Sequence, residues 1–288
     1  MTAEAIAQPL VPPKPPSEIA RRVLVYVLLL LVSLLFFVPF IWSVSTSFKT
    51  LPDTQNYNFI PHPFTTAAWK TVWTQYDFKR YIANSFFLAI VITTINLVLS
   101  SLGGYAFARL HFPGRELLFL LVLGTLMIPD QLRLIPVFVL LTNWHLIASF
   151  TGYILINLVS ATNLFFMRQY FLTIPRDYEE AAKLDGAGPI KTYWRVMLPL
   201  AAPAMAALAI LQFQGTWNDF FWPLILFGQG SPHLYTVQLG LAEFVLTYQT
   251  QWPELMAGSL IAIIPILVIF VSFQRYFIQG VTASGVKG

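Results

Sequence analysis

The feature that most constrains this chain is a long run of apolar residues near its start. No charged side chain lies between Arg22 and Lys49, and Val23–Val44 is almost wholly apolar. An α-helix rises about 1.5 Å per residue, so this stretch reaches roughly 33 Å, which matches the hydrocarbon core of a bilayer. It is too long for the apolar region of a signal peptide, and no A-x-A cleavage pattern follows it. We therefore expect a retained transmembrane helix.

Five further stretches have the same character, and the composition agrees with them. Charged residues make up 10% of the chain and hydrophobic residues 57%, whereas a soluble domain has about 25% charged residues. This excludes a soluble enzyme, a disordered regulator and a nucleic-acid-binding module. The predicted fold class is an all-α integral membrane protein with six transmembrane helices in a lipid bilayer. The further spans are expected at about Ile82–Tyr105, Leu117–Leu140, Gly152–Tyr170, Pro199–Phe227 and Leu255–Phe273.

The distribution of basic residues predicts that both termini are cytoplasmic. In that orientation twelve of the 17 Lys and Arg residues lie on the cytoplasmic side and five lie outside, as the positive-inside rule requires. The external loop Ser45–Arg80 is an exception, because it carries four basic residues. The expected organisation is a disordered Pro-rich cytoplasmic tail over 1–20, a membrane domain over 21–277, and a cytoplasmic C-terminal tail over 278–288.

The longest polar stretch on the cytoplasmic side is Leu172–Pro199, between the fourth and fifth spans. Asp177 and Glu180 have the spacing of a capping box, which predicts a helix over Tyr178–Asp185. Gly186 is placed to end that helix in a left-handed conformation. A second short helix is expected over 189–198, with a proline in its first turn.

A helix as short as the first of these is not stable alone in water, since isolated helices below ~12 residues are marginal. We therefore expect it to pack against something else. Ala181 and Ala182 allow a close approach, and Tyr178 and Leu184 offer apolar contact. The alternative is a solvated loop that merely joins two spans.

The loop contains the pattern E-A-A-x-x-x-G at 180–186, followed by V-x-L-P at 196–199. This pattern resembles the signature loop of permease subunits of ATP-binding-cassette importers, in which isoleucine is commonest where Val196 stands. The fuller string EEAAKLDGAGPIKTYWRVMLPL resembles the carbohydrate branch of that family, particularly the second, maltose-type permease. TWNDFFWPL at Thr216–Leu224 and QGVTASGVKG at Gln279–Gly288 support the resemblance, which covers the chain from about residue 20 onward.

The resemblance implies a type I importer permease fold, with the loop over 172–199 acting as a coupling helix seated on a separate cytoplasmic ATPase subunit. It also implies a second permease subunit, two copies of the ATPase subunit and an external solute-binding protein. The expected location is the cytoplasmic membrane of a bacterium or archaeon. By match to the motif, the ATPase-coupling residues are Glu179, Glu180, Ala181, Ala182, Asp185 and Gly186.

The sequence contains no nucleotide-binding or metal-binding motif. Gly186–Thr192 (GAGPIKT) comes nearest to a P-loop, but Lys191 is one position early and Ile190 stands where glycine is required. The four histidines have no metal-ligand spacing, and there is no cysteine. We therefore expect a transport subunit rather than an enzyme, with no cofactor on this chain and with ATP and Mg²⁺ on the partner ATPase.

Polar residues inside membrane spans are costly and often functional. Amides and carboxylates hydrogen-bond hydroxyl groups, and aromatic rings offer faces to sugar C–H groups, so a neutral di- or oligosaccharide is the expected solute. The alternative for each amide is a hydrogen bond between helices, worth about 0.6 kcal/mol on average. The predicted pathway residues are Asn96, Asp130, Arg133, Asn163, Gln214, Trp217, Asn218, Asp219 and Trp222, with Asn157 and Gln212 as further polar residues in the spans.

Three alternatives to this interpretation stay open. Asp130 and Arg133 are spaced i and i+3, so they could neutralise each other on one helix face. A glycerol-phosphate-type solute would favour basic residues along the path, and Arg133 alone qualifies among the predicted residues. An ion-gradient-driven secondary transporter could use Asp130 and Asp219, but it would not need a docking loop.

Overall fold

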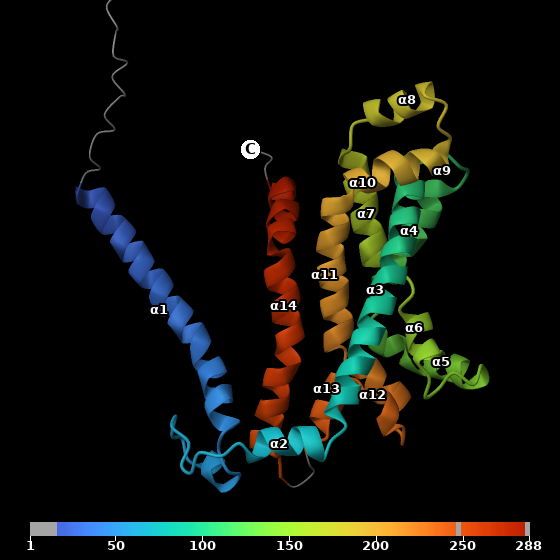
Figure 1. Cartoon of the computed structure of the whole chain (residues 1–288). Coiled ribbons are helices and arrows are strands. Elements are labelled where there is room, and N and C mark those ends of the chain that lie inside the picture. Colours follow the sequence, from blue (N-terminus) through green and yellow to red (C-terminus); the bar gives the residue numbers. More distant parts are fainter. Residues whose placement is uncertain (1–15, 246–248, 286–288) are drawn as a thin grey trace, which may run out of the picture.

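The computed structural model describes residues 16–245 and 249–285, and this part of the chain is almost entirely helical (Figure 1). Three of its helices are each long and apolar enough to cross a membrane. They coincide with the first, second and sixth predicted spans and confirm them. These helices are α1 (Pro16–Thr46), α3 (Phe78–Arg109) and α14 (Trp252–Gly285).

The third predicted span is wrong as a single helix. It consists of α4 (Arg115–Thr125) and α5 (Asp130–Asn143), whose axes meet at 98°. A helix of 11 residues reaches only about 16 Å, too short to cross the bilayer alone. Pro129 stands immediately before α5, and a proline disfavours the helical conformation in the residue before it, here Ile128. Hydropathy over the whole stretch conceals this break.

The fourth predicted span is also broken, into α6 (Phe150–Ile156) and α7 (Ala161–Thr173), with a bend of 46°. The break is stabilised locally. The Ser160 hydroxyl accepts a hydrogen bond from the Asn163 backbone N–H at 3.2 Å, so this side chain caps α7. Since the cap position has an extended backbone, the helix cannot continue through it from α6.

The fifth predicted span divides at both of its ends. The central helix is α11, and its axis lies at 74° to the preceding short helices. After α11 the backbone becomes extended at Asp219, and a further short helix follows. The three elements are α10 (Leu198–Leu200), α11 (Ala202–Asn218) and α12 (Phe221–Phe227).

The centre of the bundle is α3, which packs against α7 on one side and α11 on another, while α14 packs on α11. The approach of α3 to α7 is close. A methyl group added at Gly104 would lie 2.6 Å from Met167 Cβ, so any larger residue would force the two helices apart. By contrast, α1 leans away from the bundle (Figure 1), and the apolar side chains along its membrane-spanning length are exposed.

The two ends of the molecule carry different elements (Figure 1). The first turn of α1 and the last turns of α14 lie at the same end as the loop between α7 and α11. That loop contains α8 (Asp177–Leu184) and α9 (Pro189–Thr192). The opposite end carries α2 (Ala67–Thr74), α13 (Val237–Ala242) and the 3-10 turns η1 (Pro52–Gln55) and η3 (Pro232–Leu234).

Both predicted tails include residues that belong to long helices. Helix α1 already begins at Pro16, so residues 16–20 are helical. Proline is tolerated at the first position of a helix because the N–H that it lacks would have no helical partner there. Helix α14 continues to Gly285, past the expected domain end at 277. The rest of the two predicted tails, residues 1–15 and 286–288, lies outside the described residues.

The basic residues of the loop between α1 and α3 are partly accounted for by their surroundings. Lys49 is buried, with 1% of its surface exposed. Its Nζ donates a hydrogen bond to the carbonyl of Asn58 at 2.5 Å and lies 4.6 Å from the centre of the Trp42 ring. Arg80 pairs with neighbouring Asp77 at 3.2 Å. Two of the four exceptions to the positive-inside rule, Lys49 and Arg80, therefore have partners within the chain.

Candidate functional site

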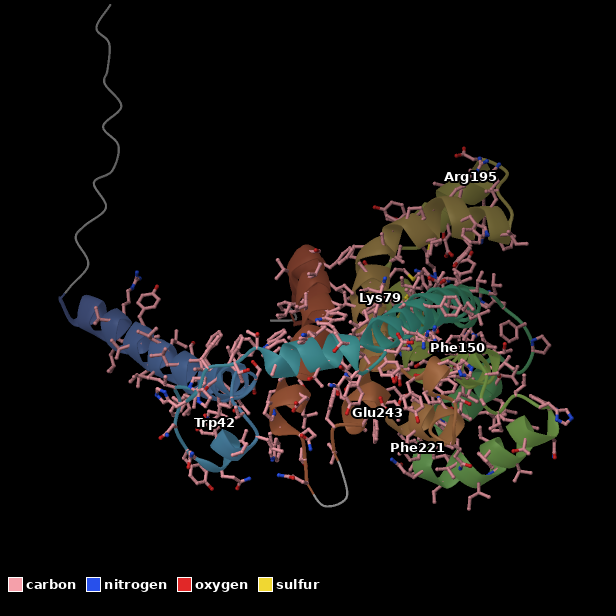
Figure 2. The ribbon with its side chains drawn as sticks, turned by 60° about the horizontal axis from the view of Figure 1, so that its bottom comes forward. Trp42, Lys79, Phe150, Arg195, Phe221 and Glu243 are labelled. Atoms are coloured by element: carbon pink, nitrogen blue, oxygen red, sulfur yellow. The ribbon has the colours of Figure 1, made fainter. Side chains whose placement is uncertain are left out.

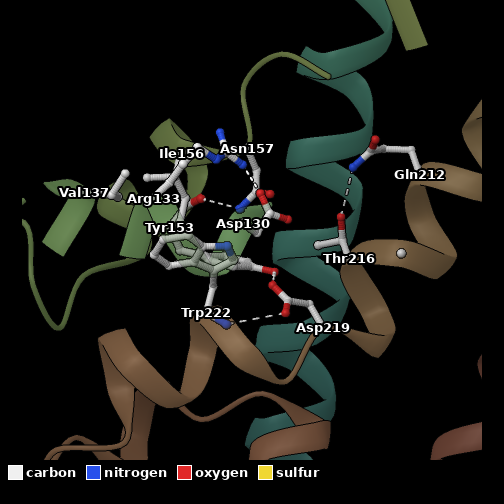
Figure 3. Close-up of a pocket in the computed structure, with 11 residues that line it drawn as sticks. Asp130, Arg133, Val137, Tyr153, Ile156, Asn157, Gln212, Thr216, Asp219 and Trp222 are labelled. Atoms are coloured by element: carbon white, nitrogen blue, oxygen red, sulfur yellow. Dashed lines mark hydrogen bonds and ion pairs between the residues drawn. The ribbon is translucent and has the colours of Figure 1, made fainter. Parts of the chain in front are cut away.

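A cavity of about 390 Å³ lies where α5, α6, α11 and α12 meet (Figure 3). It is at the end of the molecule that holds Phe221, far from Arg195 on the loop after α7 (Figure 2). Four of the nine predicted pathway residues line it, although they come from two separate helices and one helix junction. The lining residues are Asp130, Arg133, Val137, Tyr153, Ile156, Asn157, Gln212, Gly215, Thr216, Asp219 and Trp222.

Asp219 is the best-anchored acidic group of the cavity. It follows the last residue of α11, and one carboxylate oxygen accepts hydrogen bonds from the backbone N–H groups of Phe221 (3.1 Å) and Trp222 (3.4 Å). The other oxygen accepts a 2.7 Å hydrogen bond from the Tyr153 hydroxyl (Figure 3). Asp219 therefore joins the junction of α11 and α12 to α6.

Asp130 and Arg133 form an ion pair across one turn of α5. The sequence left open whether these two residues neutralise each other, and the structure shows that they do. Their side chains are 57% and 49% exposed, respectively, so both keep hydrogen-bonding capacity toward the cavity. An arginine offers five N–H donors and a carboxylate accepts at two oxygens, which leaves free positions after the pair has formed.

Tyr153 was not predicted from the sequence, although a signal for it exists. It stands one helical turn before Asn157, and the Asn157 side chain donates to the Tyr153 carbonyl at 2.9 Å. Residues four apart share a helix face, so the polar Asn157 indicates which face of α6 is turned to the cavity. Thr216 was also missed, and it accepts a hydrogen bond from Gln212 at 3.3 Å.

Asn96 and Asn163 do not line the cavity. The Asn163 amide donates to Asn96 Oδ1 and to Gln212 Oε1, both at 2.8 Å. Asn96 is 1% exposed and Asn163 is 6% exposed. Together the three amides connect α3, α7 and α11 by hydrogen bonds. This is the alternative to a pathway role that the sequence left open for each amide.

Three further predicted pathway residues lie elsewhere. Trp217 belongs to the core between α11 and α14, where its indole N–H donates to the Ala262 carbonyl at 3.1 Å and its ring stacks on Phe213. Gln214 is exposed on α11, away from the cavity. Asn218 is exposed and accepts a hydrogen bond from Gln238. Successive residues on a helix point in different directions, so the string around Asp219 cannot all face one cavity.

The loop after α7 forms two short helices, as predicted, but the capping box is wrong. Helix α8 begins at Asp177 itself, and Arg176 holds the cap position without a side-chain hydrogen bond. Gly186 has the predicted left-handed conformation, with φ of 73°. Helix α9 begins at Pro189, as expected, and continues through a π-helical turn, η2 (Tyr193–Met197), into α10.

Helix α8 has an inward and an outward face. Ala182 is buried, and Glu179 forms an ion pair with Arg109 of α3 at 3.5 Å, with both side chains largely buried. Glu179 therefore faces the chain's own body. The other predicted coupling positions are exposed: Glu180, Ala181, Asp185 and Gly186. Within the described residues, no group of three His, Asp or Glu side chains could hold a metal ion.

Comparison with known proteins places the chain in a family. Residues 100–283 match the model of the binding-protein-dependent transport system inner membrane component. The chain is 41% identical over 208 residues to the arabinooligosaccharides transport system permease protein AraQ of Halalkalibacterium halodurans, covering 72% of this chain and 74% of the relative. It is 35% identical over 209 residues to the sn-glycerol-3-phosphate transport system permease protein UgpE of Yersinia pestis, covering 72% and 74%.

The fold is also found among solved structures. A chain of a bacterial ABC transporter involved in the import of the acidic polysaccharide alginate superposes with a TM-score of 0.80 at 24% identity, covering 93% of this chain and 100% of that one. At this identity the likeness concerns the fold. It confirms the type I importer permease architecture that the sequence predicts.

This chain belongs to the family of inner membrane components of binding-protein-dependent transport systems. It is a permease subunit of an ATP-binding-cassette importer, which confirms the class that the loop motif indicates. The family consists of transport components, so the expectation of a transport subunit rather than an enzyme is confirmed, and a carrier driven by an ion gradient is set aside. Systems of this family work with a solute-binding protein.

Proposed function

We propose that this chain is one of two permease subunits of an ATP-driven oligosaccharide importer, and that a separate ATPase subunit docks on the outward face of α8. That face is the observation that carries the proposal. Glu180, Ala181 and Asp185 are exposed on it, and Leu184 is 90% exposed. Tyr178 and Ile190 of the same loop are exposed as well, and several exposed apolar side chains on one loop suit a surface that another protein covers.

A hollow beside α8 fits the same role. It measures about 650 Å³ and lies between the two halves of the loop. Tyr178 and Ala181 line it from α8, and Lys191 and Arg195 line it from the second half. A side chain of the ATPase subunit could enter this hollow, while Gly186 forms the turn between the halves. ATP and Mg²⁺ would be bound by the ATPase subunit, with no cofactor on this chain.

Co-purification from native membranes tests the docking role. The wild-type chain should bring down the ATPase subunit and a second permease. Glu180→Arg places an opposite charge on the outward face and should lower the recovered ATPase at least fivefold, whereas Asp77→Arg at the other end of the molecule should not. Purification of the chain alone, or normal ATPase recovery and transport with Glu180→Arg, would overturn the proposal.

The cavity supports the second permease as a partner. Asp130 and Arg133, on its α5 side, are about half exposed, so this chain alone does not enclose a solute. In addition, α1 stands away from the rest of the bundle (Figure 1). Helix α8 lies at the same end of the molecule as the first turn of α1 and the last turns of α14. If the ATPase subunit docks on α8 from the cytoplasm, this arrangement supports cytoplasmic termini.

The proposed solute is an oligosaccharide that passes the cavity. Hydroxyl groups of a sugar can bond Tyr153, Asn157 and Asp130, and the Trp222 ring offers an apolar face. AraQ relatives support this class by their names. UgpE relatives favour a glycerol-phosphate solute instead, but Arg133 is the one basic side chain among the cavity's lining residues.

Uptake by cells that lack other routes separates the two solutes. Radiolabelled arabinotriose should accumulate in an ATP-dependent manner when the complete transporter is expressed, and Trp222→Ala should reduce its uptake. Trp252→Ala, a change of an exposed tryptophan outside the cavity, is the matched control. Accumulation of sn-glycerol 3-phosphate without arabinotriose would show that the proposed solute class is wrong.

A further inference from the structure

Three polar residues form a stripe along one face of α3 at the end that carries the loop. They are Ser101, Tyr105 and Arg109, each four positions after the one before it. This spacing places them above one another on the helix. Each one contacts a different part of the loop between α7 and α11, and none of them belongs to the loop motif.

The first two residues of the stripe bind the second half of the loop. Ser101 and Tyr193 share a hydrogen bond of 2.7 Å between their hydroxyl groups, and both residues are buried. Tyr193 begins the π-helical turn η2. One turn further along α3, the Tyr105 hydroxyl donates to the Pro189 carbonyl at 3.4 Å. The start of α9 and the start of η2 are therefore both attached to α3.

Arg109 binds the first half of the loop. Its guanidinium group forms the ion pair with Glu179 of α8 and also donates to the carbonyls of Phe171 and Ile174 at the end of α7. The Arg109 side chain is 5% exposed. A buried arginine with several partners is costly to disturb, because removing one partner leaves a charge without compensation.

The opposite end of α3 has a second set of attachments. The Tyr81 hydroxyl donates to Glu243 at 2.9 Å, and the Asn84 amide donates to the Tyr235 carbonyl at 2.9 Å. Ser85 accepts the Val237 backbone N–H at 2.8 Å. These contacts hold the segment over 233–243, which contains α13, onto the first two turns of α3.

Between its two sets of attachments α3 is continuous. It has 32 residues and no internal proline, so it extends roughly 48 Å. The other long helices described here contain Pro39 or Pro265, and the remaining spans are bent pairs. Helices usually bend at proline residues and at existing kinks, and α3 has no proline at which to bend. The Gly103–Gly104 pair within α3 lies directly against α7.

We propose that α3 is the rigid link between the coupling loop and the segment over 233–243, with Ser101, Tyr105 and Arg109 as the positioning residues that fasten the loop to it. Movement of α8 by the ATPase would then carry the opposite end of the permease with it. This inference rests on the proposed docking of the ATPase on α8, and it deepens that function by naming the side chains that transmit it.

The test uses the whole transporter in proteoliposomes and a pair of small changes. Glu179→Gln removes the ion pair but leaves the outward face of α8 intact, and Tyr193→Phe removes one hydroxyl. The double variant should keep the ATPase subunit bound and hydrolyse ATP without solute, yet lose at least fivefold in stimulation by a binding protein loaded with arabinotriose. Glu116→Gln, at the same end but with ion-pair partners Arg115 and Arg168 outside the loop, should behave as wild type.

The outcomes separate this inference from the function on which it rests. A wild-type complex without an ATPase subunit refutes the proposed function. A responsive wild type with an equally responsive double variant refutes the positioning role alone. If the double variant does not assemble, the ratio of stimulated to unstimulated ATPase activity is measured for each single variant instead. Ratios equal to wild type in both single variants refute the positioning role.

A second measurement needs no solute. The sequence has no cysteine, so Lys183→Cys on α8 and Ala242→Cys on α13 provide unique sites for two spin labels. In the labelled complex without the Glu179 and Tyr193 changes, the distance between the labels should stay the same with and without ATP, because both elements move with α3. In the double variant ATP should change it. A wild-type distance that shifts with ATP by several Å would show that α3 is not a rigid link.

Discussion

Replacing Gly104 with alanine tests how closely α3 and α7 pack. The added methyl group would lie 2.6 Å from Met167 Cβ and 2.8 Å from the Arg168 backbone nitrogen. Carbon atoms in favourable contact are about 3.5–4.0 Å apart, so the two helices must separate by roughly 1 Å. No rotamer change relieves either contact, because one atom is a Cβ and the other belongs to the main chain.

The magnitude follows from three contributions. Overpacking of this kind costs about 1–3 kcal/mol. Separation of the helices also stretches the 2.8 Å hydrogen bond between Asn163 and Asn96, and such a bond between membrane helices is worth about 0.6 kcal/mol. Alanine in place of glycine favours the helix by up to about 1 kcal/mol. The net loss of folding free energy should be about 0.5–2.5 kcal/mol.

The assay is the thermal midpoint of the detergent-solubilised protein, followed by size-exclusion chromatography. Gly124→Ala is the matched control, because apart from the adjoining backbone of α4 no atom lies within 4 Å of the added methyl group. Gly104→Ala should melt several degrees below wild type, and Gly124→Ala should melt at or above it. A second change, Met167→Ala, should not rescue the first, since the Cβ remains. Equal midpoints for the two glycine variants would refute the close packing of α3 and α7.

Three further results are expected. Lys49→Met should make the loop between α1 and α3 more sensitive to limited proteolysis, because the carbonyls of Asn56 and Asn58 lose their buried donor. The control Lys70→Met changes an exposed lysine and should not have this effect. Equal cleavage of the two variants would contradict the prediction. Gly186→Ala should weaken the coupling of ATP hydrolysis to transport, because a backbone φ of 73° costs a non-glycine residue about 1–2 kcal/mol. Gly186→Asn should be closer to wild type in the ATPase assay, because asparagine adopts this left-handed conformation more readily than alanine. The hydrogen bond from the His62 backbone N–H lowers the pKa of Asp53 below 3.8. The ionised Asp53 carboxylate should therefore stabilise the folded protein fully above pH 3.8, and this contribution should disappear as the pH falls through the lowered pKa. Asp53→Asn should remove this pH dependence from the thermal midpoint measured over the same pH range.

The sequence predicted the coupling loop better than it predicted the spans. The turn at Gly186 and the helix start at Pro189 depend on neighbours in the chain, because each residue restricts its own backbone. The third and fourth spans depend on more. Hydropathy sums over the residues of a stretch, so it did not detect the 98° bend before Asp130. Pro129 marks the position of the break, but the angle depends on what α5 packs against.

The candidate cavity was predicted in part, for a related reason. Asp130, Arg133, Asp219 and Trp222 were identified by their polarity or by their motif, and they do meet. Tyr153 was missed, since a tyrosine within an apolar stretch gives no sign that its hydroxyl bonds a carboxylate 66 positions further along the chain. Trp217, in the same motif as Asp219, turned out to be core.

By itself the sequence determined the helical membrane class, the position of the coupling loop and the family, because these depend on apolar length, local backbone preferences and a short motif. The tertiary structure alone decided which polar side chains share a cavity and which tie helices together. It also decided that Glu179 points inward to Arg109 while Glu180 points outward. The physical reason is that a polar group in a membrane must find a partner, and that partner is set by which helices the folded bundle brings together.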